Sequence, residues 1–298
     1  MASGTTPLLP AFTVIGAMKS GTTTLYRDLR SHPQICVPEK EVNILAQQRS
    51  GDEIVAAYQR LFQGTRPSLV RGDISTTYSM QPMHMGVPER ARAVLGDELK
   101  IIYIVRHPVI RTLSHHRHMH AWHGPDRMSH DINACIRQRP ELIEFSCYGR
   151  QLSAWSRVFD RARIKVVIFE EYIARRREVI EDLCQFLEVS SPAASLNFSE
   201  AFNCSDDKRV MNTFWAGVWD SPLYQSWIRP MIPLGVKDRM REMLLPKAPA
   251  PPAPPSDDTM RSIVDALRDD AEELATMLQR TTPIWELDQP QARQWKAA

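Results

Sequence analysis

One segment near the N-terminus constrains the fold more than any other part of this sequence. The apolar, β-compatible run Ala11 to Gly16 leads into a glycine-containing stretch, and a helix-compatible sequence begins at Thr22. In a strand–loop–helix unit, the free N–H groups and the dipole of the helix N-terminus together attract an anion. The sequence Gly16-Ala-Met-Lys-Ser-Gly-Thr-Thr23 therefore predicts a phosphate-binding loop.

Further apolar runs of strand length follow this loop. They are Gln34 to Val37, Leu69 to Asp73, Leu99 to Val105 and Arg163 to Phe169. Helix-length segments alternate with them: Asp52 to Phe62, Pro88 to Leu95, Ser146 to Phe159 and Glu171 to Leu187. Strands that alternate with helices favour a parallel sheet covered on both faces. The sequence thus predicts an α/β fold, a P-loop-type parallel β-sheet flanked by helices on both faces.

Composition excludes several classes of protein. The 298 residues carry 37 Lys and Arg against 35 Asp and Glu, a formal net charge of +2, which is too small for a general nucleic-acid binder. No apolar run approaches the roughly 18 residues that span a bilayer, and the N-terminus lacks the pattern of a secretory signal. The five cysteines are widely spaced, without C-x-x-C, as in a reduced compartment. We expect a cytoplasmic chain with no membrane span, and its oligomeric state stays open.

The phosphate loop departs from the Walker A pattern of kinases. Walker A places Lys and then Ser or Thr directly after its second glycine, where the hydroxyl binds Mg²⁺. Here Thr22 follows Gly21, and the lysine lies earlier, at Lys19. A P-loop small-molecule kinase is therefore only an alternative interpretation, because it would lack its γ-phosphate lysine at the Walker A position.

A second anion site is predicted at the end of another strand. In the run Lys100 to Pro108, Arg106 ends the strand, and Pro108 suits the first turn of a following helix that carries Arg111 and Ser114. An arginine there, with a serine eight residues on, is able to hold phosphate through charge-assisted hydrogen bonds. Two anion sites on one sheet fit a nucleotide with phosphates at both ends of its ribose.

With these two segments the sequence resembles the PAPS-dependent sulfotransferase family, whose donor is 3′-phosphoadenosine 5′-phosphosulfate (PAPS). Residues 12–45 (FTVIGAMKSGTTTLYRDLRSHPQICVPEKEVNIL) resemble the family's 5′-phosphosulfate loop, and residues 101–118 resemble its 3′-phosphate segment. The likeness extends to Gly72 to Tyr78, to Tyr148 to Val189 and, more weakly, to Leu274 to Leu287. It implies a single sulfotransferase domain over 1–298.

Within the family, the segment PEKEVNIL is most similar to the carbohydrate branch, which includes the heparan sulfate enzymes. Two positions depart from that branch: Ile74 stands where it usually carries a lysine, and Ile44-Leu45 replaces its aromatic pair. The expected acceptor is therefore a hydroxyl or amine of either a carbohydrate or a small molecule. A catalytically inactive nucleotide-binding regulatory protein is a second alternative.

The resemblance also implies roles for individual residues. Lys19 would stabilise the leaving oxygen, while the 5′-phosphate would be held by the remainder of the loop, namely Ser20, Gly21, Thr22 and Thr23. Arg106 with Ser114 would bind the 3′-phosphate. Lys208 with Arg209 would either fold over it or form a solvated charge pair. Glu41 is the candidate general base, and its rivals are His115, His116 and Asp73; His116 is retained as a candidate catalytic residue. The alternative interpretation of Glu41 is a surface ion pair with Lys40 or Arg49.

Other features have simpler interpretations. Six of the nine histidines fall between His115 and His130, and His116 with His120 has the i, i+4 spacing of a metal chelate, but we expect no metal because no carboxylate or thiolate stands at a matching spacing. Residues 175–177 (Arg-Arg-Arg) are interpreted as a solvated helix face. The Pro-rich stretch 246–255 is interpreted as a loop, followed by a docked C-terminal helix at about 257–281 with Ser256 as its N-cap.

Overall fold

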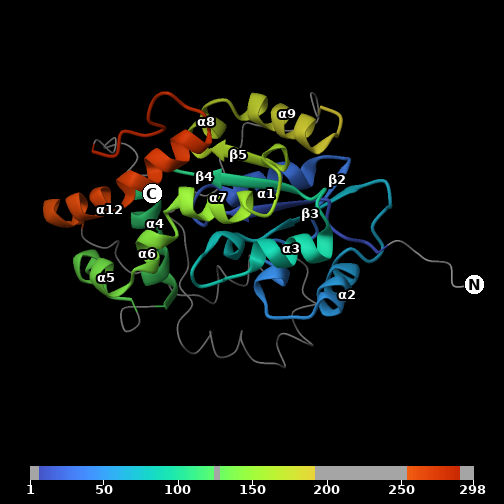
Figure 1. The fold of residues 1–298 in the computed structure, drawn as a ribbon, viewed down its shortest axis with the longest axis horizontal. Helices are drawn as coiled ribbons and strands as arrows, with labels where there is room; N and C mark the ends of the chain where they lie inside the picture. Colours follow the sequence, from blue (N-terminus) through green and yellow to red (C-terminus); the bar gives the residue numbers. More distant parts are fainter. Residues whose placement is uncertain (1–6, 124–127, 192–253, 289–298) are drawn as a thin grey trace, which may run out of the picture.

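The computed structural model describes residues 7–123, 128–191 and 254–288. At its centre lies a parallel sheet with the strand order β2-β3-β1-β4-β5 (Figure 1). Its strands are β1 (Phe12–Gly16), β2 (Ile35–Cys36), β3 (Val70–Ile74), β4 (Lys100–Val105) and β5 (Ile164–Ile168). The predicted α/β class is confirmed, and each expected strand agrees with the observed one to within one residue at either end.

Helices connect the strands and cover both faces of the sheet (Figure 1). The α-helices are α1 (Thr22–Ser31), α2 (Gly51–Leu61), α3 (Val87–Leu95), α4 (Pro108–His123), α5 (Ile132–Gln138), α6 (Glu141–Glu144), α7 (Tyr148–Ser156), α8 (Phe169–Ala174), α9 (Arg176–Leu187) and α12 (Asp257–Met277). Short 3₁₀ helices are η1 (Ile44–Ala46), η2 (Thr76–Ser79) and η3 (Arg161–Arg163). The single helix expected over 171–187 is instead two, because Arg175 has non-helical backbone angles (φ −131°, ψ 49°) between α8 and α9.

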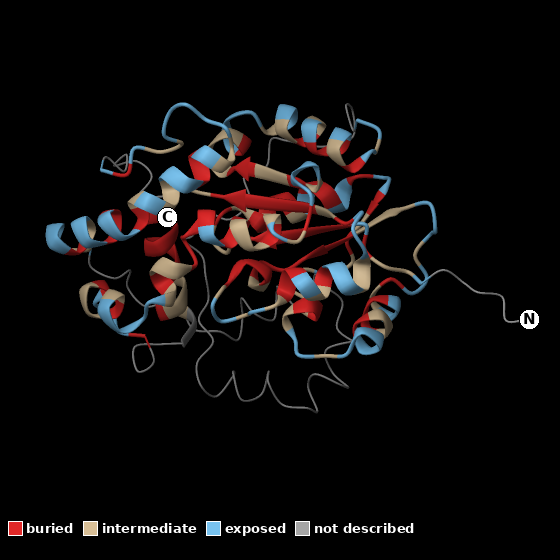
Figure 2. Ribbon diagram, viewed as in Figure 1, coloured by how far each residue is buried: buried red, intermediate tan, exposed pale blue. Residues whose placement is uncertain are grey.

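Alternation along the strands divides the core into two layers. In β4, Ile102 and Ile104 pack with the apolar faces of α1 and α9, whereas Ile101, Tyr103 and Val105 pack with α2, α3 and α7. Successive side chains of a strand point to opposite faces, so a strand buried on both sides is apolar throughout. Figure 2 shows the strands largely buried, with the exposed residues on the outer faces of the helices.

A buried ion pair joins α1, the helix after the phosphate loop, to the first residue of α9. Asp28 of α1 accepts hydrogen bonds from Arg176 Nε at 2.9 Å and Nη2 at 2.6 Å, and also from the Tyr172 hydroxyl. The side chains of Arg176 and Asp28 are only 9% and 7% exposed. Residues 175–177 are thus not simply a solvated face: the middle arginine is a structural residue.

Replacing Asp28 by alanine is expected to lower the free energy of unfolding by about 3–5 kcal/mol, because it leaves the guanidinium of Arg176 buried without its partner. Urea denaturation monitored by circular dichroism measures this change. The matched control is Glu178→Ala, which removes a solvent-exposed partner of Arg175 at 3.6 Å and should cost at most about 0.5 kcal/mol. Equal stability of the two variants would contradict the assignment.

Helix α12 docks on the N-terminus of α7. Asp270 accepts hydrogen bonds from the backbone N–H groups of Gly149 (2.9 Å) and Arg150 (2.8 Å), where α7 has no side-chain cap of its own. A Cβ on Gly149 would lie 2.8 Å from the Asp270 carbonyl oxygen, so this close approach requires glycine. At the other end, Ser256 caps α12 by accepting from Thr259 N at 3.3 Å, which confirms the predicted N-cap.

The helices within the described ranges include none that is both long and apolar enough to cross a bilayer. Apart from its last two residues, the Pro-rich stretch 246–255 lies outside the described residues.

Candidate active site

The phosphate loop lies where β1 ends and α1 begins. Gly21 forms the N-cap of α1 in a left-handed conformation (φ 89°) and makes no side-chain hydrogen bond to the helix. A Cβ at this position would also lie 2.5 Å from the Phe169 ring, so only glycine fits. Lys19 is likewise left-handed (φ 72°). The first-turn N–H groups therefore depend on something other than an N-cap side chain, as at a helix that binds an anion.

Ser20 places a buried hydroxyl in this loop. Its side chain is 0% exposed, yet its Oγ has no hydrogen-bond partner within the described part of the protein. Buried hydroxyls are nearly always hydrogen-bonded, and the polar group that faces this one within the protein is the Tyr148 phenol. Tyr148 of α7 lies close behind Ser20, and burial raises the pKa of Tyr148 to about 12, which keeps its phenol protonated.

The structure brings the second predicted anion site to the first. Arg106 follows β4, and its Nη1 donates to the backbone carbonyl oxygen of Lys19 at 3.5 Å. Its guanidinium lies 5.0 Å from the centre of the Phe169 ring, the same ring that packs on Gly21. Burial lowers the pKa of Arg106, but a guanidinium remains charged in a protein. Ser114 is buried on α4, two turns after Pro108.

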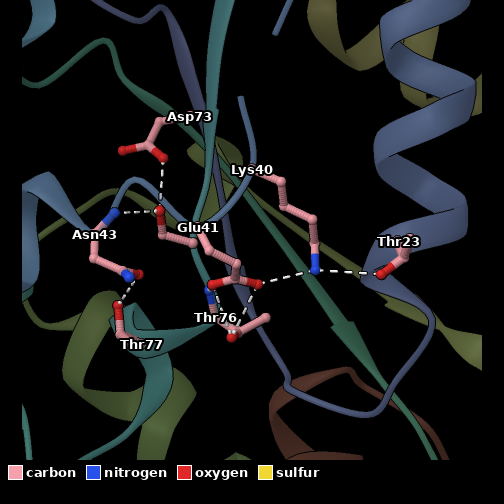
Figure 3. A network of polar contacts seen from close by, with 8 residues as sticks. Thr23, Lys40, Glu41, Asn43, Asp73, Thr76 and Thr77 are labelled. Atoms are coloured by element: carbon pink, nitrogen blue, oxygen red, sulfur yellow. Dashed lines mark hydrogen bonds and ion pairs between the residues drawn. The ribbon is translucent and has the colours of Figure 1, made fainter. Parts of the chain in front are cut away.

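Glu41 lies on the opposite side of the loop, in a network of polar contacts (Figure 3). Its Oε2 accepts a hydrogen bond from the backbone N–H of Thr76 at 2.9 Å, and its Oε1 pairs with Lys40 Nζ at 2.9 Å. Lys40 Nζ also lies 3.3 Å from Thr23 Oγ1, in the first turn of α1. The ammonium group of Lys40 thus bridges the carboxylate of Glu41 and the Thr23 hydroxyl of the phosphate loop.

Asp73, a rival candidate for the base, is hydrogen-bonded to this network through Ser75. It is 0% exposed and accepts hydrogen bonds from Tyr58 OH (2.7 Å), Tyr78 OH (2.5 Å) and Ser75 Oγ (2.8 Å). Burial raises the pKa of Asp73. Ser75 Oγ in turn accepts from Asn43 N at 3.0 Å, which fixes the segment that carries Glu41. Asp73 is enclosed by side chains and positions the site from within the protein.

The two rival histidines point in different directions from α4. His115 stacks on Phe145, and burial together with nearby charges, among them Arg111 and Lys19, lowers its pKa to about 2. A group with so low a pKa is a weak proton acceptor at neutral pH. His116 lies instead against another segment, with its Nε2 2.9 Å from the Ser129 carbonyl oxygen. Burial lowers the pKa of His116 too.

Lys208 and Arg209 lie outside the described residues, so their predicted role at the 3′-phosphate stays a prediction. In the ranges 7–123, 128–191 and 254–288, no three His, Cys, Asp or Glu side chains are grouped in a way that could hold a metal ion. The sequence indicated Lys40 only as a surface partner of Glu41, and it gave Thr76 and Tyr148 no role in the site. The structure shows the Lys40–Glu41 pair but places it beside the phosphate loop.

Comparison with known proteins identifies the family. A family model described as "Sulfotransferase domain" matches residues 9–208, which include the loop, Glu41 and Arg106. The chain belongs to the sulfotransferase family. This sulfotransferase is therefore an enzyme, a transferase.

Individual relatives are distant. The sulfotransferase is 24% identical over 216 residues to the mouse protein "Bifunctional heparan sulfate N-deacetylase/N-sulfotransferase 4", in a match that covers 67% of this chain and 24% of the mouse protein. The chain thus spans about a quarter of that relative's length. Among solved structures, a sulfotransferase from Alicyclobacillus acidocaldarius aligns with a TM-score of 0.60 and 22% identity, covering 92% of this chain and 97% of the other. The "Sulfotransferase Domain from the Curacin Biosynthetic Pathway" aligns with a TM-score of 0.52 and 17% identity, covering 93% and 100%. These two alignments show the shared fold.

Proposed function

We propose that this sulfotransferase moves the sulfuryl group of PAPS to a hydroxyl or amine of a carbohydrate or small-molecule acceptor, without a metal. The observation that carries the proposal is the contact between Arg106 and the Lys19 carbonyl, because it joins the two predicted anion sites at the carboxyl ends of neighbouring strands β1 and β4. Ligands of open α/β sheets bind at this edge. A nucleotide with a 5′-phosphosulfate and a 3′-phosphate has one anionic group for each site.

The residues of the loop hold the donor in this proposal. The N–H groups of the first turn of α1 and the buried Ser20 hydroxyl bind the 5′-phosphate, and Thr22 and Thr23 add their hydroxyls. Arg106 and Ser114 bind the 3′-phosphate. The donor supplies an activated sulfuryl group, whose transfer places growing negative charge on the leaving 5′-phosphate oxygen. Lys19 stabilises that charge, because preorganised cations act most strongly where charge develops.

Glu41 takes the proton of the acceptor. Its carboxylate is partly exposed, at 35% of the side chain, and is held in place by Thr76 N–H and Lys40. By contrast, Asp73 is enclosed, His115 is a weak base in its buried position, and His116 is turned toward Ser129. Of the four candidates, Glu41 combines access for an acceptor with a fixed position beside the phosphate loop, as a general base requires.

The nucleotide preference follows from the loop sequence. We expect adenosine 3′,5′-bisphosphate to bind tightly in EDTA and ATP to bind poorly, because Thr22 stands where Walker A has the lysine that reaches the β- and γ-phosphates. Isothermal titration calorimetry measures both affinities. Tight, Mg²⁺-dependent binding of ATP would instead favour a small-molecule kinase. A screen of acceptors with PAPS, read as the mass gain of one sulfuryl group, tests turnover and separates an enzyme from a protein that only binds nucleotide.

A further inference from the structure

The mechanism above uses Lys40 only to hold Glu41 in place. Its backbone pairs with Ile74 at the end of β3, and its ammonium group reaches both Thr23 Oγ1 at 3.3 Å and Glu41 Oε1 at 2.9 Å (Figure 3). The side chain is only 19% exposed. The ammonium thus lies between the hydroxyl of the phosphate loop and the carboxylate of the proposed base.

The two lysines approach the N-terminus of α1 from different sides. In the sheet, β1 lies between β3 and β4. Lys19 is close enough to His115 of α4, the helix that follows β4, to contribute to the lowered pKa of that histidine. Lys40 comes from the β3 side, together with Glu41 and Thr76. The 3′-phosphate residues Arg106 and Ser114 lie on the β4 side, so Lys40 stands on the side where the acceptor would be deprotonated.

We infer that Lys40 is a second catalytic cation, which binds the non-bridging oxygens of the sulfuryl group during transfer. The inference rests on the proposed function and extends it. In the reaction, the acceptor oxygen or nitrogen forms a bond to sulfur, and the bond from sulfur to the 5′-phosphate oxygen breaks with its electron pair left on the phosphate. The acceptor's proton goes to Glu41. Lys40 stays protonated throughout and takes no part in the proton transfer.

The position of Lys40 matches the path of the transferred group. That group begins bonded to the 5′-phosphate in the cradle that includes Thr23, and it ends on an acceptor whose proton has gone to Glu41. The Lys40 ammonium contacts both ends of this path. An ammonium has three donors, so it is able to keep the Glu41 contact while donating to sulfuryl oxygens.

The test compares two ligands that differ by the sulfuryl group alone. Lys40→Met removes the charge with little change in length, and Lys40→Arg retains it. Isothermal titration without acceptor gives the affinity of each variant for PAPS and for adenosine 3′,5′-bisphosphate. We expect Lys40→Met to weaken PAPS binding by about tenfold to a hundredfold, the worth of one hydrogen bond to a charged group, and to change bisphosphate binding by less than about twofold. Lys40→Arg should restore most of the PAPS affinity.

Lys100→Met is the matched control, because Lys100 is similarly buried (14% exposed) and pairs with Glu188 at the other end of the sheet. It should alter neither affinity. Equal weakening of both ligands by Lys40→Met would overturn the inference, since Lys40 would then only support the loop; so would two unchanged affinities. If Lys40→Met does not fold, as judged by thermal unfolding, Lys40→Gln is compared in the same way. Failure of the unaltered enzyme to bind either nucleotide would instead refute the proposed function.

Discussion

Lys19→Ala is expected to lower kcat by a factor on the order of 10² to 10³, the usual effect of removing one preorganised contact to developing charge. Lys19 lies in the loop between β1 and α1, in a left-handed conformation that the loop itself imposes. The side chain is proposed to act on the leaving oxygen, whose charge exists mainly in the transition state. We therefore expect the affinity for adenosine 3′,5′-bisphosphate to change much less than kcat. Steady-state kinetics with saturating PAPS, together with calorimetry, measure the two effects.

Arg106→Ala is the matched comparison for this prediction, because its guanidinium touches the same loop at the Lys19 carbonyl. It should chiefly weaken donor binding, by about 1.5 to 3 kcal/mol, as expected for the loss of a hydrogen bond to a charged group. If both variants changed kcat and donor affinity in the same proportion, the separate roles of Lys19 in turnover and Arg106 in donor binding would be refuted.

Glu41→Gln is expected to abolish transfer and to leave bisphosphate binding intact. The amide oxygen of glutamine is still able to accept the hydrogen bond that Thr76 N–H now donates to Glu41 Oε2, so the segment should keep its conformation. An amide does not accept the proton of a hydroxyl or amine under these conditions, so the acceptor would not be activated. A discontinuous assay with labelled PAPS gives the turnover, and calorimetry gives the binding.

Two histidine variants serve as controls for the base. His116→Ala should retain most of the turnover, because this ring is bonded to the Ser129 carbonyl and not to the loop. His115→Ala should also retain the base, since a buried imidazole with a pKa of about 2 takes up no proton near neutrality. Near-normal turnover in Glu41→Gln, with loss of turnover in either histidine variant, would move the base to α4.

The sheet could be predicted from the sequence because its signals are local. The apolar residues of β4 face both layers of the core, and a run without polar positions already indicates a strand buried on two sides. Gly21 is conspicuous for a similar reason: a glycine directly before a helix-compatible segment marks a position that favours a left-handed backbone angle. The glycines, Lys19 and Arg106 could thus be assigned to one edge of the sheet without coordinates.

The rest of the site depends on contacts between distant segments. Neighbouring residues of a helix point about 100° apart, so the sequence predicts that His115 and His116 face different surroundings. Which of the two faces the loop depends on how α4 packs against α6 and the segment near Ser129. Arg176 is similar, because an arginine among arginines gives no local sign of a buried aspartate 148 residues away. The break at Arg175 separates α8 from α9 and was likewise not evident in the helical pattern.

The hydrogen bonds from Gly149 and Arg150 to Asp270 form late in synthesis, after the rest of the phosphate site has been translated. Tyr148, which lies behind Ser20, is the first residue of α7, and the cap of that helix comes from a residue 121 positions after Gly149. A ribosome adds about 5–20 residues per second, so the strands and the phosphate loop emerge on the order of ten seconds before the carboxylate that caps α7. The N-terminus of α7, which begins at Tyr148, therefore receives its cap only after residue 270 has been translated.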